Sequence, residues 1–346
     1  MKLSKPLSSA IMLLGVIALT ACGGKKNADK SGGNAVAADG TITIKLSHVV
    51  AAETSKGRGA EYFKKLVEER TQGKVKVQVY PNSQLYKDKE ELEALQMGSV
   101  QMLIPSLSKF GPLGAKEFEA FDLPYLFPNL AAVHKVTQGA IGQQLLGKLE
   151  PYGIKGLGFW DNGFKIFSAN KPIQNPEDLK GMKLRIQSSK VLEEQMKVLG
   201  ALPQSMAFSE VYQALQTGVV DGTEQTPTQS FSQRFYEVQK DYAVTNHGYL
   251  GYAVVVNKKF WDGLPADTRK TLEDAMNDTT KYVNDMTEKE NSDDLAKIAA
   301  SGKSTVTQLK PEQIEAWKKA MAPTYQQVQS RIPNELVDSI KKEIGN

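Results

Sequence analysis

The sequence predicts an α/β fold. Segments in which polar and apolar residues alternate are interleaved, twice along the chain, with segments in which apolar residues recur at helical spacing. Strands and helices in this order are typical of α/β architecture with a largely parallel sheet. The 346 residues are 40% hydrophobic and 24% charged, the composition of an ordinary globular protein. The length suggests two domains.

The first round of elements covers the region that begins at Thr41. Alternation or short apolar runs predict three strands, at residues 41–47, 74–80 and 100–104. Between them, the apolar positions from Ala60 to Val67 recur at helical spacing, and Gly73 lies where this helix would end. A second helix is predicted over Asp88–Met97, with Leu92 and Leu95 facing inward.

The second round begins near residue 154. Strands are predicted at residues 154–159, 165–168, 182–187, 242–257 and 305–309. Helices are predicted at residues 191–199, 210–216, 265–300 and 311–329. The helix over Pro265–Ala300 would be roughly 54 Å long at about 1.5 Å per residue. It would exceed either of two domains, so we expect it to run along both.

The N-terminus has the features of a secretory signal. Two lysines precede the apolar run Ala10–Leu19, which is too short to span a bilayer that needs about 20 residues. The following Leu19-Thr20-Ala21-Cys22 resembles the lipobox of bacterial lipoproteins, and Cys22 is the only cysteine of the chain. We expect residues 1–21 to be a lipoprotein signal peptide and Cys22 to carry lipid. The alternative is an ordinary cleaved signal followed by an incidental cysteine.

The segment after Cys22 predicts a tether. Residues 22–40 are rich in Gly, Lys, Asn, Ala and Ser and show no apolar periodicity, as in a flexible linker. Five lysines but one acid precede Asp39, whereas the rest of the chain has 38 basic and 38 acidic residues. The charge distribution therefore argues against nucleic-acid binding. We expect a periplasmic or extracytoplasmic protein that is lipid-anchored to a bacterial membrane.

The sequence shows no constellation typical of an enzyme. No pair among His48, His134 and His247 has metal-ligand spacing, and no cysteine follows Cys22, so neither a metal site nor a thiol nucleophile is predicted. Residues 142–148 fit Gly-x-x-x-x-Gly-Lys, but the next residue is leucine rather than the Ser or Thr of a phosphate-binding loop. We therefore predict neither catalysis nor a cofactor.

The most informative segment is Asn162–Asp241. It contains three long motifs: GMKLRIQ (Gly181–Gln187), MAFSEVYQALQTGVVDGTEQTP (Met206–Pro227) and QRFYEVQK (Gln233–Lys240). Together they closely resemble the substrate-binding subunit of tripartite ATP-independent periplasmic (TRAP) transporters, in particular the branch that binds C4-dicarboxylates such as succinate, malate and fumarate. The resemblance covers nearly all of Thr41–Lys310. A run of 22 residues such as the second motif is highly specific.

The resemblance implies a two-lobed, periplasmic-binding-protein-like fold with hinge strands and a long helix that spans both lobes. The first lobe would comprise residues 41–162 plus 251–290, and the second residues 163–250 plus 291–346. The protein would capture its ligand by cleft closure and deliver it to a permease of small and large integral membrane subunits. Two alternatives stay open: another organic acid (a hexuronate, a 2-oxo acid or an aromatic acid), or a sensing subunit that reports to a histidine kinase.

The resemblance also implies the cations of the site. Arg185 matches the main carboxylate ligand of the family, a role suited to a planar, permanently charged fork; its alternative is a structural salt bridge. Lys165 lies where relatives place a second cation, and its alternative is a solvent-facing strand lysine. Lys56, ahead of the first helix, would bind the distal carboxylate from the other lobe.

The remaining implied contacts are neutral. Gln225 stands where family members commonly have Asn, so the amide is kept with one more methylene. Phe208 would form an apolar wall, with simple core packing as the alternative. His48 would be a polar ligand contact or a satisfied loop histidine. Ser106 and Asn162, at strand ends, are candidate hydrogen-bond donors.

Overall fold

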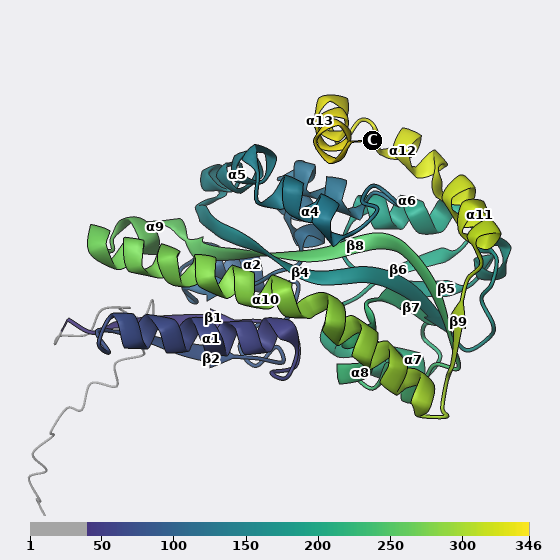
Figure 1. Cartoon of the computed structure of the whole chain (residues 1–346), viewed down its shortest axis with the longest axis horizontal. Coiled ribbons are helices and arrows are strands. Elements are labelled where there is room, and N and C mark those ends of the chain that lie inside the picture. The colour runs from purple at the N-terminus through teal and green to yellow at the C-terminus, as the bar shows by residue number, and fades with distance from the viewer. Residues whose placement is uncertain (1–39, 346) are drawn as a thin grey trace, which may run out of the picture. The chain divides into compact units, whose positions relative to one another are not determined.

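The structure, a computed structural model, describes residues 40–345. The predicted signal peptide (1–21), Cys22 and nearly all of the predicted tether (22–40) lie outside the described residues. Within them, one nine-stranded sheet has the order β2-β1-β3-β8-β4-β7-β5-β6, with β9 beside β8 (Figure 1). The strands are β1 (Ile42–Ser47), β2 (Val75–Tyr80), β3 (Met102–Leu103), β4 (Ile154–Ala169), β5 (Lys183–Ile186), β6 (Leu202–Ser205), β7 (Gly222–Gln225), β8 (Asp241–Asn257) and β9 (Thr305–Gln308).

The sheet is mixed rather than largely parallel. β1 is parallel to β2 and β3, and β5 is parallel to β6 and β7. Between these two groups, β4 and β8 are antiparallel to each other and to their neighbours β7 and β3. The two long strands therefore cross from one group of parallel strands to the other, as expected of hinge strands.

β4 is one continuous strand where the sequence predicted two. Its register with β8 shifts between Asp161 and Gly163 and again between Lys165 and Phe167. Bulges of this kind interrupt the alternation of inward and outward residues, so the pattern breaks although the strand continues. Gly163 has φ +121°, a backbone conformation that favours glycine.

Thirteen α-helices are described in residues 40–345. They are α1 (Ser55–Arg70), α2 (Glu91–Gln96), α3 (Phe110–Leu113), α4 (Leu130–Thr137), α5 (Ala140–Gly147), α6 (Lys190–Val198), α7 (Val211–Gln216), α8 (Pro227–Ser232), α9 (Lys258–Asp262), α10 (Ala266–Ala300), α11 (Pro311–Met321), α12 (Pro323–Val328) and α13 (Asn334–Ile344). The single helix predicted at 311–329 is divided into α11 and α12 at Pro323, which has no N–H to continue the hydrogen-bond ladder.

The long predicted helix is confirmed: α10 spans 35 residues. It packs against α1, β4 and α8 (Figure 1). Polar side chains on its inner face bind the crossing strand, because Thr280 accepts the indole N–H of Trp160 at 3.0 Å and Asn284 accepts the backbone N–H of Asp161 at 2.9 Å. The helix thus spans both groups of parallel strands and is hydrogen-bonded to β4 where this strand passes from one group to the other.

Separate apolar cores support an α/β fold with two lobes. One core includes Phe63 of α1 and Val283 of α10, and another includes Leu184 of β5 and Trp317 of α11. The exact lobe boundaries, 41–162 plus 251–290 and 163–250 plus 291–346, stay a prediction. Within the described part of the chain, no helix combines the length and the apolar character needed to cross a bilayer.

The two lobes touch through a smaller apolar cluster. Val49 and Val50, just after β1, pack with Phe208, Val211 and Phe235 of the second lobe. These five side chains are at most 8% exposed. Three of the residues that the sequence predicted for the site, His48, Lys56 and Phe208, lie in or close to the segments that form this contact.

Candidate functional site

The sheet register places Arg185 and Gln225 on one face. Arg185 of β5 lies opposite Thr223 of β7, and Gln225 follows Thr223 by two residues, so it points to the same side of the sheet. Arg185 and Gln225 are each 1% exposed. A strong cation and an amide are therefore buried close to each other at the end of two parallel strands.

Arg185 has no carboxylate within ion-pair distance in the described part of the chain. Its Nε and Nη2 donate to the backbone oxygen of Met206 at 3.2 and 3.0 Å, while Nη1 is buried with no partner among residues 40–345. Burial lowers the pKa of Arg185, and Asp88 and Glu224 oppose this shift from a longer distance. Within residues 40–345 the structural salt bridge considered as its alternative role is therefore not formed, and the Nη1 edge of the guanidinium has no protein partner.

Gln225 and Phe208 complete this side of the site. Both amide atoms of Gln225 are buried without a hydrogen-bond partner among the described residues. The Phe208 ring lies 5.8 Å from the Arg185 guanidinium carbon and makes an edge contact with Phe235 at 5.9 Å between ring centres. Phe208 therefore packs in a core cluster and borders the Arg185 guanidinium, and its role as an apolar wall for the ligand stays a prediction.

Lys165 is neither solvent-facing nor free. Its Nζ lies 2.5 Å from Oε2 of Glu224, and both side chains are buried. Glu224 also contacts Nε2 of His247 at 3.3 Å. Burial would raise the pKa of Glu224, but Lys165 and His247 outweigh it and lower this pKa overall. Because neighbouring strand residues point to opposite faces, Glu224 and Gln225 point apart, and the Lys165 charge is largely neutralised by its own partner.

The first lobe contributes a buried lysine next to a neutral histidine. Nζ of Lys56 donates to the backbone oxygen of Ile104 at 3.0 Å and lies 3.7 Å from the centre of the Tyr252 ring. Burial and the nearby Lys109 lower the pKa of Lys56 to about 7. Burial and Lys56 lower the pKa of His48 to about 3, so His48 is neutral, and neither ring nitrogen has a partner among the described residues.

Ser106 and Asn162 are already hydrogen-bonded within the protein. Ser106 donates to the side-chain oxygen of Gln187 in the second lobe. The Asn162 amide donates to the Tyr252 hydroxyl and accepts from the Thr226 hydroxyl. Both residues therefore hold segments of the site together, and their role as direct ligand donors stays a prediction.

Asp88 is a site residue that the sequence did not predict. One of its carboxylate oxygens lies 2.5 Å from Nζ of Lys109, and the other accepts the backbone N–H of Phe208, in the other lobe, at 2.7 Å. Burial would raise the pKa of Asp88, but Lys109 lowers it to about 2. With Arg185 and Met206, Asp88 and Lys109 line a cavity of about 270 Å³. The sequence around Asp88 shows a run of charges, which gives no signal for this contact.

The arrangement suits an organic anion better than a metal ion. In residues 40–345, no group of three or more His, Cys, Asp or Glu side chains could hold a metal. The buried atoms without a partner include Nη1 of Arg185 and both amide atoms of Gln225. The Arg185 guanidinium and the Gln225 amide NH₂ are N–H donors at the ends of neighbouring strands, and such donors can bind the oxygens of a carboxylate.

Known proteins share the sequence over nearly the whole described chain. A C4-dicarboxylate-binding periplasmic protein DctP of Rhodobacter capsulatus is 59% identical over 300 residues, covering 87% of this chain and 90% of that protein. A C4-dicarboxylate-binding protein DctB of Bacillus subtilis is 42% identical over 297 residues, covering 86% of this chain and 85% of the relative.

Solved structures agree with these relatives. A TRAP periplasmic solute-binding protein of Shewanella oneidensis with bound succinate has a TM-score of 0.86 and 40% identity, and the match covers 88% of this chain and 99% of that one. One of Pseudomonas aeruginosa with bound L-malate has a TM-score of 0.81 and 43% identity, with coverage of 83% and 99%.

The family model for bacterial extracellular solute-binding proteins, family 7, also named DctP, matches residues 46–331. Its members are extracytoplasmic binding proteins rather than enzymes, in keeping with the absence of catalytic motifs from the sequence. The chain belongs to this DctP family of bacterial extracellular solute-binding proteins.

Proposed function

We propose that the protein binds a C4-dicarboxylate such as succinate, malate or fumarate and delivers it to a TRAP permease. The observation that carries this proposal is Arg185, a buried guanidinium with an unpartnered nitrogen and no carboxylate at ion-pair distance in residues 40–345. An uncompensated buried charge is costly, and a carboxylate that accepts from the guanidinium removes this cost. The relatives named for C4-dicarboxylates support the same ligand.

A dianion needs a second cation, and the structure favours Lys56 for it. Lys165 is neutralised by Glu224 at 2.5 Å, whereas Lys56 contacts a carbonyl oxygen and an aromatic ring. Arg185 and Lys56 belong to different lobes, so a ligand with a carboxylate at each end would bridge them. A ligand that binds both lobes stabilises the form in which they touch.

The other predicted contacts fit around these two cations. Gln225, with both amide atoms buried and unpartnered in the described chain, would bind the same carboxylate as Arg185. The neutral His48, 0% exposed, would bind near Lys56. Phe208 would cover the methylene carbons of the ligand. Ser106 and Asn162 would act through the segments they hold.

Other organic acids are less well supported. Matched structures with bound β-D-galacturonate are 25% and 26% identical to this chain, whereas those with succinate or L-malate are 40–45% identical. A galactonate complex is 28% identical. A sensing role with a histidine kinase has no specific observation in its favour, so delivery to a permease of small and large membrane subunits is the function proposed.

Membrane attachment is part of the proposal and rests on the sequence. The lipobox-like Leu19–Cys22 would direct cleavage before Cys22 and lipid attachment to it, and residues 22–40 would form the tether. Stable anchoring takes more than one acyl chain, as bacterial lipoproteins carry. In a Cys22→Ser variant we expect the protein to leave the membrane fraction. Retention of that variant at the membrane would contradict lipid attachment.

A thermal-shift panel of organic acids tests the ligand. We expect succinate, malate and fumarate to raise the unfolding temperature and hexuronates, 2-oxo acids and aromatic acids to have little effect. Arg185→Ala should abolish the shift, because a buried charge-paired contact is worth roughly 2–5 kcal/mol. Arg70→Ala is the matched control, since Arg70 pairs with Asp278 on the surface. Binding of succinate by Arg185→Ala within a few-fold of the parent would refute the assignment.

A further inference from the structure

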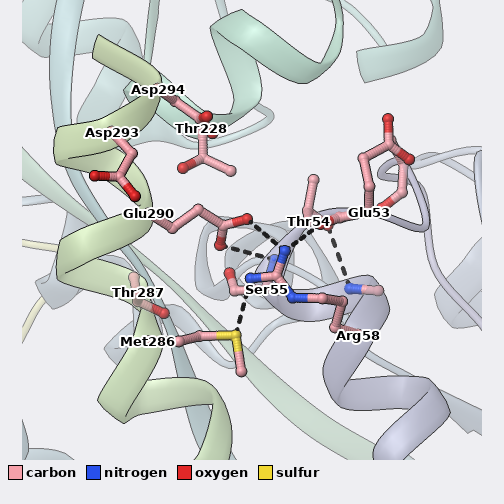
Figure 2. Close-up of polar contacts among 12 residues, drawn as sticks. Glu53, Thr54, Ser55, Arg58, Thr228, Met286, Thr287, Glu290, Asp293 and Asp294 are labelled. Atoms are coloured by element: carbon pink, nitrogen blue, oxygen red, sulfur yellow. Dashed lines mark hydrogen bonds and ion pairs between the residues drawn. The ribbon is translucent and has the colours of Figure 1, made fainter. Parts of the chain in front are cut away.

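Helix α10 reaches the first turn of α1 through Glu290. Its Oε2 accepts the backbone N–H of Ser55 at 2.9 Å, and its Oε1 forms an ion pair with Nη1 of Arg58 at 3.1 Å (Figure 2). The Glu290 side chain is 13% exposed and that of Arg58 is 42% exposed. A helix that packs on both lobes is thereby attached to the beginning of a helix in the first lobe.

The start of α1 depends on this contact. Thr54 caps the helix by accepting the N–H of Gly57 at 3.2 Å, but the first turn of α1 contains no acidic residue. The first N–H groups of a helix have no partner within it, and a negative charge beside them is favourable. Glu290 supplies both the acceptor for Ser55 and the charge, from a helix far along the chain.

The residue after Ser55 is the buried Lys56. Its side chain leaves the first turn of α1 and reaches the backbone oxygen of Ile104 and the ring of Tyr252. Because Lys56 follows Ser55 directly in the first turn of α1, a contact that holds the Ser55 N–H also restricts where the Lys56 side chain leaves the helix. Glu290 itself lines a cavity of about 800 Å³ that Lys56 does not line.

We propose that Glu290 is a positioning residue for ligand binding, which holds the first turn of α1 so that Lys56 meets the distal carboxylate of the ligand. This inference rests on the proposed function. Burial raises the pKa of Glu290, while Arg58 and Ser55 oppose the shift. The two contacts therefore also favour the charged carboxylate that the helix end requires.

The neighbouring residue Asn291 makes the corresponding contact to the second lobe. Its Nδ2 donates to the backbone oxygen of Asn162 at 2.6 Å, and its Oδ1 accepts the N–H of Thr228 at 3.2 Å. Thr228 lies three residues after Gln225. The adjacent residues Glu290 and Asn291 of α10 thus bind segments that carry proposed ligand groups of both lobes, and Glu290 binds the segment that carries Lys56.

The test compares two ligands that differ in one charge, succinate and its monoamide succinamate. By titration calorimetry, Glu290→Ala should weaken succinate binding about tenfold and change succinamate binding little, because the second carboxylate alone meets Lys56. Glu290→Gln should restore part of the succinate affinity, since its amide oxygen still accepts from Ser55. Asp293→Asn is the matched control: Asp293 lies one turn away, is 49% exposed and pairs with the exposed Lys289.

A double variant shows whether Glu290 acts through Lys56. If it does, Glu290→Ala should cause no further loss of succinate affinity in a Lys56→Met background. Equal weakening of succinate and succinamate, or additive losses in the double variant, would overturn the positioning role. If the parent protein does not bind succinate, the proposed function and this inference both fail. If Lys56→Met no longer distinguishes succinate from succinamate but Glu290→Ala still does, only the positioning role of Glu290 fails.

Discussion

Replacement of Lys56 by methionine should stabilise the ligand-free protein and weaken dicarboxylate binding. Burial lowers the pKa of Lys56 from 10.5 to about 7, so between pH 7 and 10.5 the unfolded chain holds a proton that the folded chain releases. Stability therefore rises with pH through this window as far as Lys56 is concerned. At about 1.4 kcal/mol per pH unit, the charged lysine costs the fold about 4 kcal/mol at pH 7.

The methionine keeps the length of the side chain and removes the charge. Loss of the hydrogen bond to Ile104 and of the contact with the Tyr252 ring offsets part of the gain, by about 1 kcal/mol each. We therefore expect Lys56→Met to raise the free energy of unfolding by about 2 kcal/mol at pH 7.

Urea unfolding at pH 7 without ligand measures this gain, and calorimetry with succinate measures the loss of affinity. Lys64→Met is the matched control, because Lys64 lies on the same helix and its side chain is 38% exposed. A ligand-free Lys56→Met protein that is less stable than the parent, or one that binds succinate as tightly, would refute the account of this lysine.

Three further outcomes follow from the site and the hinge. Succinate affinity should fall as pH rises from 7 to 9, because Lys56 loses its proton above a pKa of about 7; calorimetry at both pH values should show no such dependence for Lys56→Met. Asp88→Asn should weaken succinate binding about tenfold, because its carboxylate joins Lys109 to the Phe208 N–H across the lobes, and an unchanged affinity would exclude Asp88 from closure. Gly163→Ala should lower the free energy of unfolding by about 1–3 kcal/mol, because φ is +121° and the new Cβ would lie 2.7 Å from Nδ2 of Asn291; in urea, Gly147→Ala, which meets no neighbour within 4 Å, should be near neutral.

Elements with strong local patterns were predictable from the sequence. β1 and β2 alternate polar and apolar residues over their whole length, and α10 continues for 35 residues without an internal glycine or proline. β6 (Leu202–Ser205) and β7 (Gly222–Gln225) were missed, because four residues carry too little pattern and their pairing with β5 and β4 decides their conformation.

The candidate site, too, was predictable from the sequence only in part. A resemblance of long motifs indicated Arg185 and Gln225, and the structure places them on one face of the sheet. The pairing of Lys165 with Glu224 and the contact of Asp88 with Phe208 join residues 59 and 120 positions apart. Such contacts form only when distant strands and loops come together in the fold, so no local sequence pattern predicts them.

The continuous crossing strands restrict how the two lobes can move. β4 and β8 pass between the lobes as paired strands rather than as loose linkers. Free rotation of one lobe against the other would therefore break a ladder of backbone hydrogen bonds. Bending is cheapest where this ladder is already interrupted, at the register shift beside Gly163. The lobes should therefore move by a bend of small angle about a single axis across the paired strands.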